Sequence, residues 1–234
     1  MSGTLYGIGV GPGDPDLLTL KAHRLLQALP VLAWPAPLAG DGLARSIAAP
    51  HIPAGKTEIV IRLAFRPERD DTESAYDAAA ATIAGHLDAG RDVGVLCEGD
   101  PLFFGSFIYL LARLGGRFPV TVVPGVSSPM AAAAALVRPL AALDDCVAIV
   151  PATRPEAEIE RLLAAADAAV VMKLGRHLPK VARVLARLRL DDDARVVEQV
   201  GLPGQRLLTL AEAEESGIGY FSLALVHRRG EIPR

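Results

Sequence analysis

Residues 93–106 read VGVLCEGDPLFFGS and predict a buried strand, a tight acidic turn and the start of a helix. The first five residues are apolar, as in a strand that is covered on both faces. Gly99 permits backbone conformations closed to other residues, the Asp100 carboxylate can cap the next turn, and Pro101 suits a first helical position. Ligands of open α/β sheets bind beyond the carboxyl ends of strands. The turn is therefore a candidate site, although a plain strand-to-helix connection explains the same residues.

Apolar runs alternate with helical segments along the first half of the chain. The expected strands cover residues 4–10, 31–34, 57–63, 92–97 and 118–123, and the expected helices between them cover 17–28, 43–49, 71–89 and 104–114. This alternation predicts an α/β fold with a mainly parallel sheet and helices on its faces.

The second half repeats the alternation and then changes character. Strands are expected at 146–150, 168–174 and 195–200, with helices between them. Two short β-prone runs follow at 205–210 and 220–226. Because no long helix is expected between these two runs, we expect them to pair antiparallel. The second half is therefore predicted to be an α/β domain with a mixed sheet.

The segment 124–129, PGVSSP, is the best candidate for a domain junction. It divides the chain into an N-terminal α/β domain at 1–124 and a C-terminal α/β domain at 125–234. Ser127 or Ser128 can cap the helix that follows, so capping alone explains these serines.

Composition places the chain among globular proteins. Its 234 residues are 51% hydrophobic and 22% charged, with a net charge of −3, and neither half is strongly basic. This balance argues against nucleic acid as the main partner. No apolar run is long enough to span a bilayer and the N-terminus lacks a signal-peptide pattern, so no membrane partner and a cytoplasmic location are expected. Cys97 and Cys146 fit no metal-ligand spacing, so no metal site is expected and each is predicted to be a buried, reduced thiol.

Several kinds of chemistry find no matching pattern. Residues 7–15, GIGVGPGDP, invite a dinucleotide-binding interpretation, but Asp14 stands where the third glycine belongs and Pro12 interrupts the loop. The five histidines do not cluster at metal-ligand spacing, and no nucleophile elbow or phosphate loop is present. What the chain offers is several strand-end loops rich in Gly, Pro, Ser and acidic residues. Such loops are typical of a protein that holds a cofactor with its own reactivity.

Five segments occur in an order that carries a family resemblance: 7–15 (GIGVGPGDP), 98–105 (EGDPLFFG), 123–128 (VPGVSS), 171–173 (VMK) and 197–206 (VEQVGLPGQR). Together they resemble the tetrapyrrole (corrin/porphyrin) methylase family, over nearly the whole chain. The resemblance implies a homodimer of two-domain subunits that binds S-adenosylmethionine in a cleft between the domains. Carried over position by position, the implied cofactor-binding residues are Pro12, Glu98, Gly99, Asp100, Phe103, Ser127, Ser128, Met172, Val200 and Gly201.

Within the family, segments 98–107, 171–178 and 220–223 are similar to the branch that methylates C20 of precorrin-2. The uroporphyrinogen methylases carry a Gly-Arg-Gly-Gly-Glu pattern after the same turn, whereas here Gly105 is followed by Ser-Phe-Ile-Tyr. The resemblance therefore implies methyl transfer from S-adenosylmethionine to C20 of precorrin-2, giving precorrin-3A in cobalamin biosynthesis. It assigns no catalytic base. Cobalt-precorrin-2 of the anaerobic route is an alternative substrate, and a non-catalytic binding module on the same scaffold is a further alternative.

The implied tetrapyrrole substrate carries many carboxylates, which arginine pairs with well. Arg62, Arg66 and Arg69 flank the loop that follows the expected strand at 57–63, and they are candidate substrate-binding residues. Lys173 is a candidate from the second domain, where Arg176 could also contribute. Solvated surface side chains explain these cations equally well.

Overall fold

The computed structural model describes residues 1–64 and 69–228, and the side chains of 69–71 lie outside that description. The chain forms two compact units, Met1–Ser127 and Ser128–Arg234, and each unit is described by itself. The predicted domain boundary at residue 124 and the predicted cofactor cleft between the domains both stay predictions.

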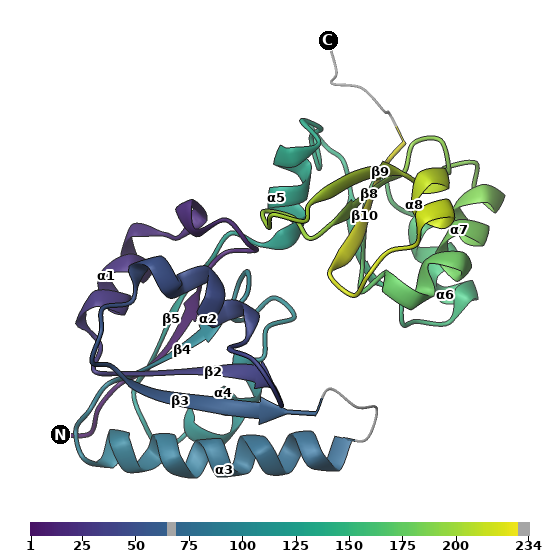
Figure 1. Cartoon of the computed structure of the whole chain (residues 1–234). Coiled ribbons are helices and arrows are strands. Elements are labelled where there is room, and N and C mark those ends of the chain that lie inside the picture. Colours follow the sequence, from purple (N-terminus) through teal and green to yellow (C-terminus); the bar gives the residue numbers. More distant parts are fainter. Residues whose placement is uncertain (65–68, 229–234) are drawn as a thin grey trace. The chain divides into compact units, whose positions relative to one another are not determined.

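Unit 1 is built on a parallel sheet of five strands in the order β3-β2-β4-β1-β5 (Figure 1). The strands are β1 (Leu5–Gly9), β2 (Val31–Pro37), β3 (Thr57–Leu63), β4 (Val93–Cys97) and β5 (Val120–Val123). Every residue of β4 is buried, which agrees with the apolar run from which a covered strand was predicted. The mainly parallel sheet expected from the strand–helix alternation is confirmed.

Helices cover both faces of this sheet. They are η1 (Pro15–Leu17), α1 (Leu20–Ala28), α2 (Leu43–Ala48), η2 (Ala49–His51), α3 (Arg69–Asp88) and α4 (Phe107–Leu114). Residues of α3 and α4, such as Ile83 and Leu110, share one apolar cluster with the sheet. Residues of α1 and α2, such as Leu26 and Ile47, belong to a second cluster. Unit 1 therefore has three layers, with α1 and α2 on one face and α3 on the other in Figure 1.

Unit 2 is built on a mixed sheet of five strands in the order β6-β7-β10-β8-β9. Its strands are β6 (Val147–Pro151), β7 (Ala168–Met172), β8 (Arg195–Glu198), β9 (Arg206–Thr209) and β10 (Ser222–His227). Strand β6 runs parallel to β7, and β10 runs antiparallel to both β7 and β8. The predicted mixed sheet is therefore confirmed.

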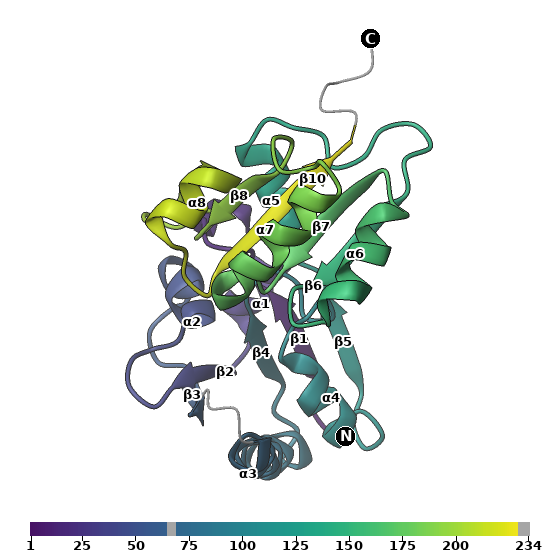
Figure 2. The same cartoon turned by 90° about the vertical axis from the view of Figure 1, so that its right-hand side faces the viewer.

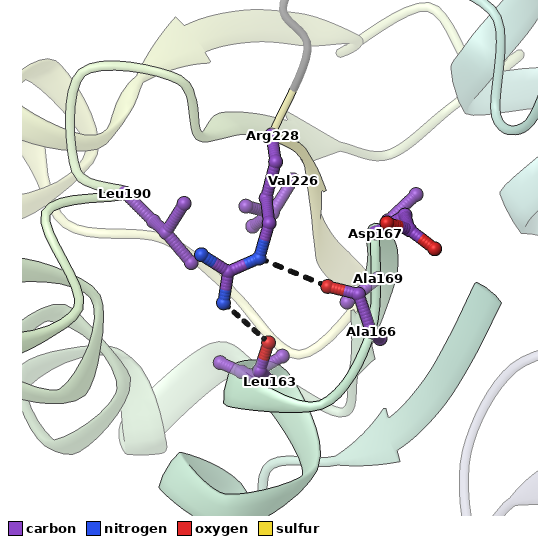
Figure 3. Close-up of a pocket in the computed structure, with 8 residues that line it drawn as sticks. Leu163, Ala166, Asp167, Ala169, Leu190, Val226 and Arg228 are labelled. Atoms are coloured by element: carbon purple, nitrogen blue, oxygen red, sulfur yellow. Dashed lines mark hydrogen bonds between the residues drawn. The ribbon is translucent and has the colours of Figure 1, made fainter. Parts of the chain in front are cut away.

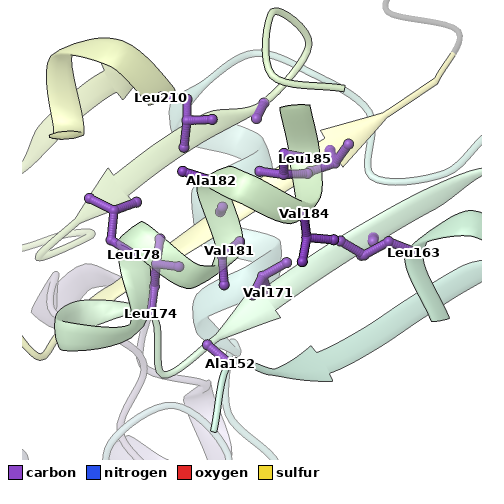
Figure 4. Packing of buried hydrophobic residues seen from close by; sticks show 14 of the residues in the cluster. Ala152, Leu163, Val171, Leu174, Leu178, Val181, Ala182, Val184, Leu185 and Leu210 are labelled. Carbon is purple, nitrogen blue, oxygen red and sulfur yellow. The ribbon is translucent and has the colours of Figure 1, made fainter. Parts of the chain in front are cut away.

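Helices also flank the sheet of unit 2. They are α5 (Ser128–Ala135), α6 (Glu156–Ala164), η3 (Gly175–His177), α7 (Leu178–Arg187) and α8 (Leu210–Ser216). Helices α6 and α7 lie on one face of the sheet in Figure 2. The close-up in Figure 4 shows Val181 and Val184 of α7 near Val171 of β7, within one buried apolar cluster. This cluster is the core of unit 2.

The expected antiparallel pairing of the last two β-prone runs is wrong. Strand β9 pairs with β8, and β10 inserts between β7 and β8. Helix α8 separates the two runs and begins with a capping box, in which Thr209 and Glu212 satisfy each other's backbone amides. All six residues of β10 are buried, and a strand of that kind belongs in the middle of a sheet.

The two cysteines differ in exposure. Cys97 at the end of β4 is buried, as predicted, and burial raises the pKa of its thiol to about 12. Cys146 is exposed, so the prediction of a buried thiol is wrong there. It precedes β6, which pairs with β7 alone at the sheet edge and therefore leaves side chains in solvent. Across the described parts of the chain, no helix combines the length and apolar character needed to cross a bilayer.

Candidate functional site

Three loops of unit 1 meet at one edge of its sheet. Because β4, β1 and β5 are parallel neighbours, the loops that follow them leave from the same carboxyl edge. The Gly99 amide donates to the Gly11 carbonyl at 2.7 Å, and the Gly11 amide donates back at 3.4 Å. These two hydrogen bonds join the predicted acidic turn to the loop after β1. Pro12, the first implied cofactor-binding residue, is buried beside this bridge.

Glycines allow these loops to approach closely. A Cβ atom added to Gly125 would overlap the Gly99 carbonyl oxygen and lie 2.9 Å from Gly9 Cα. A Cβ atom added to Gly9 would lie 2.5 Å from the Gly125 amide nitrogen. The three backbones therefore pack against one another at positions where no larger residue fits without a shift of the chain. The result is a surface at the sheet edge in which backbone groups lie close together.

The Asp100 carboxylate fastens two of these loops. Its Oδ1 accepts from the Leu102 amide at 2.9 Å, and its Oδ2 accepts from the Gly125 amide at 3.1 Å. The first bond confirms that Asp100 caps its own turn. The second bond joins the loop after β4 to the loop after β5, which the sequence did not indicate. Asp100 thus shapes the site through backbone amides.

Helix α4 begins at Phe107, whereas the sequence predicted a start at 104. The turn continues because Phe104 takes a positive φ of 55°, which interrupts a helix. The Phe103 and Phe104 rings meet edge to face with centroids 5.0 Å apart. Phe103 is half-buried and Phe104 is exposed, so the turn presents aromatic surface to solvent. A strained residue in a loop beyond a buried strand is common at functional sites.

The half-buried Glu98 links the same turn to helix α2. Its Oε1 accepts from the Ala44 amide at 3.2 Å, in the first turn of α2. Burial raises the pKa of the Glu98 carboxyl, and hydrogen bonds from backbone amides, including that of Ala44, oppose the rise. The positive end of the helix dipole also favours a carboxylate at this position. Glu98 therefore has a structural role that sequence reasoning did not assign.

The implied cofactor-binding residues of unit 2 share one edge of its sheet. Strands β7 and β8 both run antiparallel to β10, so their carboxyl ends point the same way. Met172 is the last residue of β7, and Val200 and Gly201 follow β8. The residues directly after the two strands, Lys173 and Gln199, have positive φ values of 57° and 51°. Both strands thus end in strained turns at this edge.

Ser127 and Ser128 lie at the boundary of the two units. Ser127 is the last residue of unit 1, and Ser128 is the first residue of helix α5 in unit 2. Both are half-buried. The roles of all ten implied cofactor-binding residues stay predictions.

An ion pair between buried Glu198 and partly exposed Arg206 supports the edge of unit 2. Glu198, at the end of β8, is 6% exposed and lies opposite Arg206 in the register with β9. Its Oε2 accepts from Arg206 Nε at 2.6 Å, and its Oε1 accepts from the Gly219 amide at 2.5 Å. The Ser222 hydroxyl then donates to the Gly219 carbonyl at 2.7 Å and accepts from the Gly175 amide at 3.1 Å. This Glu198 network ties the loops after β7 and β8 to the loop before β10.

Glu198 and Arg206 belong to the family segment 197–206, but no role was predicted for either residue. The available signal was an acidic residue at the end of the apolar run 195–200, followed by an arginine in the next β-prone run. If those two runs pair across a short turn, the two charges face each other.

The candidate substrate-binding cations are placed unequally. Arg62 of β3 donates from Nη1 to the Pro37 carbonyl at 2.9 Å and to the Gly40 carbonyl at 2.5 Å, so its guanidinium holds the loop after β2. Arg66 and the side chain of Arg69 lie outside the described residues. Lys173 is exposed directly after β7, and Arg176 is exposed within η3. Substrate binding by Arg62, Arg66 and Lys173 stays a prediction.

One hollow in unit 2 is occupied by a structural arginine. Figure 3 shows Arg228 donating to the carbonyl oxygens of Leu163 and Ala166, at 3.0 Å each. It also donates to the Ala164 carbonyl at 3.2 Å. These oxygens lie at the C-terminal end of α6, where a cation is favourable. Among the described residues, no three His, Cys, Asp or Glu side chains gather as a metal site would require.

Two α/β units with backbone-rich loops at the carboxyl edges of their strands are typical of a protein that binds a cofactor with its own reactivity. The sequence profile of the tetrapyrrole (corrin/porphyrin) methylases matches residues 4–214, and the chain belongs to this family. The resemblance stated from the five segments is therefore confirmed.

Individual relatives cover the chain almost completely. A precorrin-2 C(20)-methyltransferase of Sinorhizobium is 40% identical over 96% of this chain and 95% of its own length. A cobalt-precorrin-2 C(20)-methyltransferase of Salmonella typhimurium is 34% identical over 99% of both chains. A cobalamin biosynthesis protein of Mycobacterium tuberculosis is 43% identical over 96% of this chain but only 46% of its own length. The chain thus spans about half the length of this relative.

Solved structures show the same fold. The uroporphyrin-III C-methyltransferase of Thermus thermophilus, complexed with S-adenosylhomocysteine, superposes with a TM-score of 0.70 at 26% identity. The match covers 96% of this chain and 92% of the Thermus chain.

Proposed function

We propose that this chain transfers a methyl group from S-adenosylmethionine to C20 of precorrin-2, giving precorrin-3A in cobalamin biosynthesis. The observation that carries this proposal is the similarity to the Sinorhizobium C20 enzyme, which spans nearly the full length of both chains. A shared reaction requires the same cofactor loops and the same substrate surface. Similarity confined to one of the two units would not support it.

The loops of unit 1 fit a cofactor held largely through backbone groups. At Gly11, Gly99 and Gly125 the three loops meet backbone to backbone, because none of these residues carries a side chain. A ligand can therefore approach the backbone itself at this edge. The Thermus relative is named as a complex with S-adenosylhomocysteine, the product that remains after a methyl group leaves S-adenosylmethionine. Its similarity to this chain supports the same cofactor here.

S-adenosylmethionine supplies an electrophilic methyl group on a sulfonium when it is bound. The protein then contributes placement of the nucleophilic ring carbon and exclusion of water. Asp100 holds the loops after β4 and β5 in one arrangement, because each of its oxygens accepts a backbone amide. Glu98 fixes the same turn against α2. We assign these two carboxylates to orientation of the site, and we assign no residue as the base that removes the substrate proton.

Cobalt-precorrin-2 is the second candidate substrate. The Salmonella relative named for that substrate covers 99% of this chain. Both candidates require the same reaction at the same carbon, so they differ only in whether the macrocycle holds cobalt. A non-catalytic binding module is a weaker alternative, because the family loops are present at every implied cofactor position.

We also propose that the protein acts in the cytoplasm, and that it forms a homodimer, as the family resemblance implies. Light scattering coupled to gel filtration tests the assembly. A mass of about twice that of the 24.6 kDa chain supports the dimer, and a mass equal to one chain overturns it.

The proposed reaction is tested with S-adenosylmethionine that carries a labelled methyl group. Precorrin-2 made enzymatically is supplied metal-free and cobalt-loaded in parallel, and the initial rates of label transfer are compared. Faster transfer to the metal-free macrocycle supports precorrin-2, and faster transfer to the cobalt form supports the second candidate. Cofactor binding with no transfer to either macrocycle contradicts both and leaves the binding-module alternative.

A further inference from the structure

We propose that the exposed aromatic pair Tyr220–Phe221, together with Arg176, forms a surface of unit 2 that binds the face and a carboxylate of the tetrapyrrole substrate. The proposal rests on the proposed function for its choice of ligand. Its structural basis is the loop before β10, whose backbone is held by hydrogen bonds and whose aromatic rings are exposed to solvent. We call this set of three residues the aromatic platform.

The backbone of the loop before β10 is held from two sides. On the side of β8, the Gln199 amide donates to the Phe221 carbonyl at 2.7 Å. The Gly219 amide donates to buried Glu198 on the same side. On the side of β7, the Leu174 amide donates to the Ser222 carbonyl at 3.3 Å. The loop therefore has little freedom to withdraw its side chains into the core.

Despite this fixation, the two rings remain in solvent. Tyr220 is 72% exposed and Phe221 is 51% exposed, and their ring centroids lie 5.2 Å apart in an edge-to-face contact. Large aromatic side chains held rigidly at a surface are typical of binding sites, because little conformational entropy is lost on binding. Glu198 and Ser222 hold the backbone of this loop, so we assign Glu198 and Ser222 as positioning residues for the aromatic platform.

Two cationic residues belong to the segment that passes next to the aromatic pair. A Cβ atom on Gly175 would lie 3.5 Å from Tyr220 Cα, so the loop after β7 passes next to the aromatic pair. Arg176 follows Gly175 and is exposed, and Lys173 is exposed in the same loop. The positive charges of Lys180 and Arg176 add to burial in lowering the pKa of the neighbouring His177, which is consistent with local positive potential. The platform thus combines two aromatic rings with the guanidinium of Arg176.

This combination suits a flat apolar macrocycle with carboxylates on its rim. Aromatic rings contact the macrocycle face, and a guanidinium pairs with a rim carboxylate in a bidentate manner. The platform also borders the strand ends that carry Met172 and Val200, two implied cofactor-binding residues. A substrate held there would lie on the same sheet edge as the methyl donor.

The direct test uses uroporphyrin III, a stable porphyrin with eight carboxylates, and follows its fluorescence on titration with the full chain. The double variant Tyr220→Ser/Phe221→Ser is expected to weaken uroporphyrin binding by about tenfold or more, and Arg176→Ala by a few-fold. S-adenosylhomocysteine binding, measured by calorimetry, is expected to stay within about twofold of the wild type. The matched control is Val137→Ser/Leu143→Ser, which removes two other exposed apolar side chains of unit 2.

Three results would overturn the platform. The first is wild-type affinity for uroporphyrin in the double variant, and the second is a wild-type chain that binds no uroporphyrin. The third is an equal loss of uroporphyrin binding in the control variant. Because this readout needs no turnover, it stands apart from the methyl-transfer assay. A chain that binds uroporphyrin through the platform but transfers no methyl group contradicts the proposed function and supports the platform.

Discussion

The Asp100 carboxylate accepts a hydrogen bond from the amide of Gly125, 25 residues along the chain, at 3.1 Å. The same carboxylate accepts from Leu102, so one side chain holds the loops that follow β4 and β5. Asp100 was expected to cap its own turn and to lie near the cofactor. The bond to Gly125 shows that it also determines how two glycine-bearing loops lie against each other.

Replacement of Asp100 by Asn is expected to impair the site more than the fold. The Asn amide group can accept only one of the two backbone hydrogen bonds, so one amide loses its partner at a cost of about 1–2 kcal/mol. We expect S-adenosylhomocysteine affinity to fall by about tenfold, or 1.4 kcal/mol, in calorimetry. Asp92→Asn is the matched control, because Asp92 accepts from the Thr4 amide at 2.7 Å at the opposite edge of the sheet. Equal losses of affinity in the two variants would contradict a specific role for Asp100.

Replacement of Gly125 by Ala is expected to push the three loops of unit 1 apart. The added methyl group would overlap the Gly99 carbonyl oxygen, and an overpacked site of this kind costs about 1–3 kcal/mol. We expect a lower midpoint in urea unfolding and weaker cofactor binding. Gly85→Ala in α3 is the control, since nothing lies within 4 Å of its added Cβ atom. The free energy of unfolding of Gly85→Ala should rise by about 0.5–1 kcal/mol. A Gly125→Ala protein as stable as the wild type would refute the packing argument.

Replacement of Arg206 by Gln should leave the Glu198 carboxylate buried without its cation. Because Arg206 is partly exposed, its removal should destabilise the fold less than breaking a fully buried ion pair would. We expect the free energy of unfolding, measured in urea, to fall by about 2 kcal/mol. The control Arg117→Gln removes an ion pair with Asp88 in which both side chains are 59% exposed, and it should change stability by less than about 0.5 kcal/mol. Equal changes in the free energy of unfolding for the two substitutions would show that the Glu198 network stabilises the fold no more than an exposed ion pair does.

Stability of the Glu98→Gln variant relative to the wild type should depend on pH. Burial raises the pKa of Glu98 in the folded chain, so the folded state keeps its proton at pH values where the unfolded state has lost it. Wild-type stability therefore falls as pH rises from the unfolded pKa of about 4.3 through the folded pKa. The glutamine introduced at position 98 does not titrate. The free energy of unfolding of the variant, measured in urea, should therefore increase relative to that of the wild type as pH rises over that range.

Glu212→Gln provides the opposite sign for comparison. Hydrogen bonds from Thr209 lower the pKa of Glu212, so its contribution to stability is present above the unfolded pKa and disappears as pH falls. The free energy of unfolding of the wild type should therefore increase relative to that of the Glu212→Gln variant as pH rises. The same trend in both variants would contradict the assigned environment of Glu98.

Local signals predicted much of the fold. The apolar run ending at Cys97 and the Gly-Asp-Pro turn after it were sufficient to place a buried strand and a loop at its carboxyl end. They failed where contacts between distant residues decide the outcome. The helix after the turn starts late because Phe104 takes a left-handed conformation that no propensity indicates. Strand β10 does not pair with β9, the strand before it in the sequence, because a fully buried strand is favoured at the centre of the sheet.

The candidate site divides in the same way. Family segments named the residues of the loops, but not the bonds that hold them, because those bonds join positions far apart in the chain. Glu98 with Ala44 and Asp100 with Gly125 are of this kind. The exposed position of Cys146 also depends on the place of β6 in the sheet, which the strand pattern alone did not reveal.

The central claim is methyl transfer to C20, and the most direct measurement is the position of the new carbon. Precorrin-2 is incubated with the full chain and S-adenosylmethionine carrying a ¹³C-methyl group, and the product is examined by mass spectrometry and NMR. We expect one added methyl group, with its carbon signal assigned to C20. A product labelled at any other ring position would contradict the assignment, even if the chain proved an active methylase.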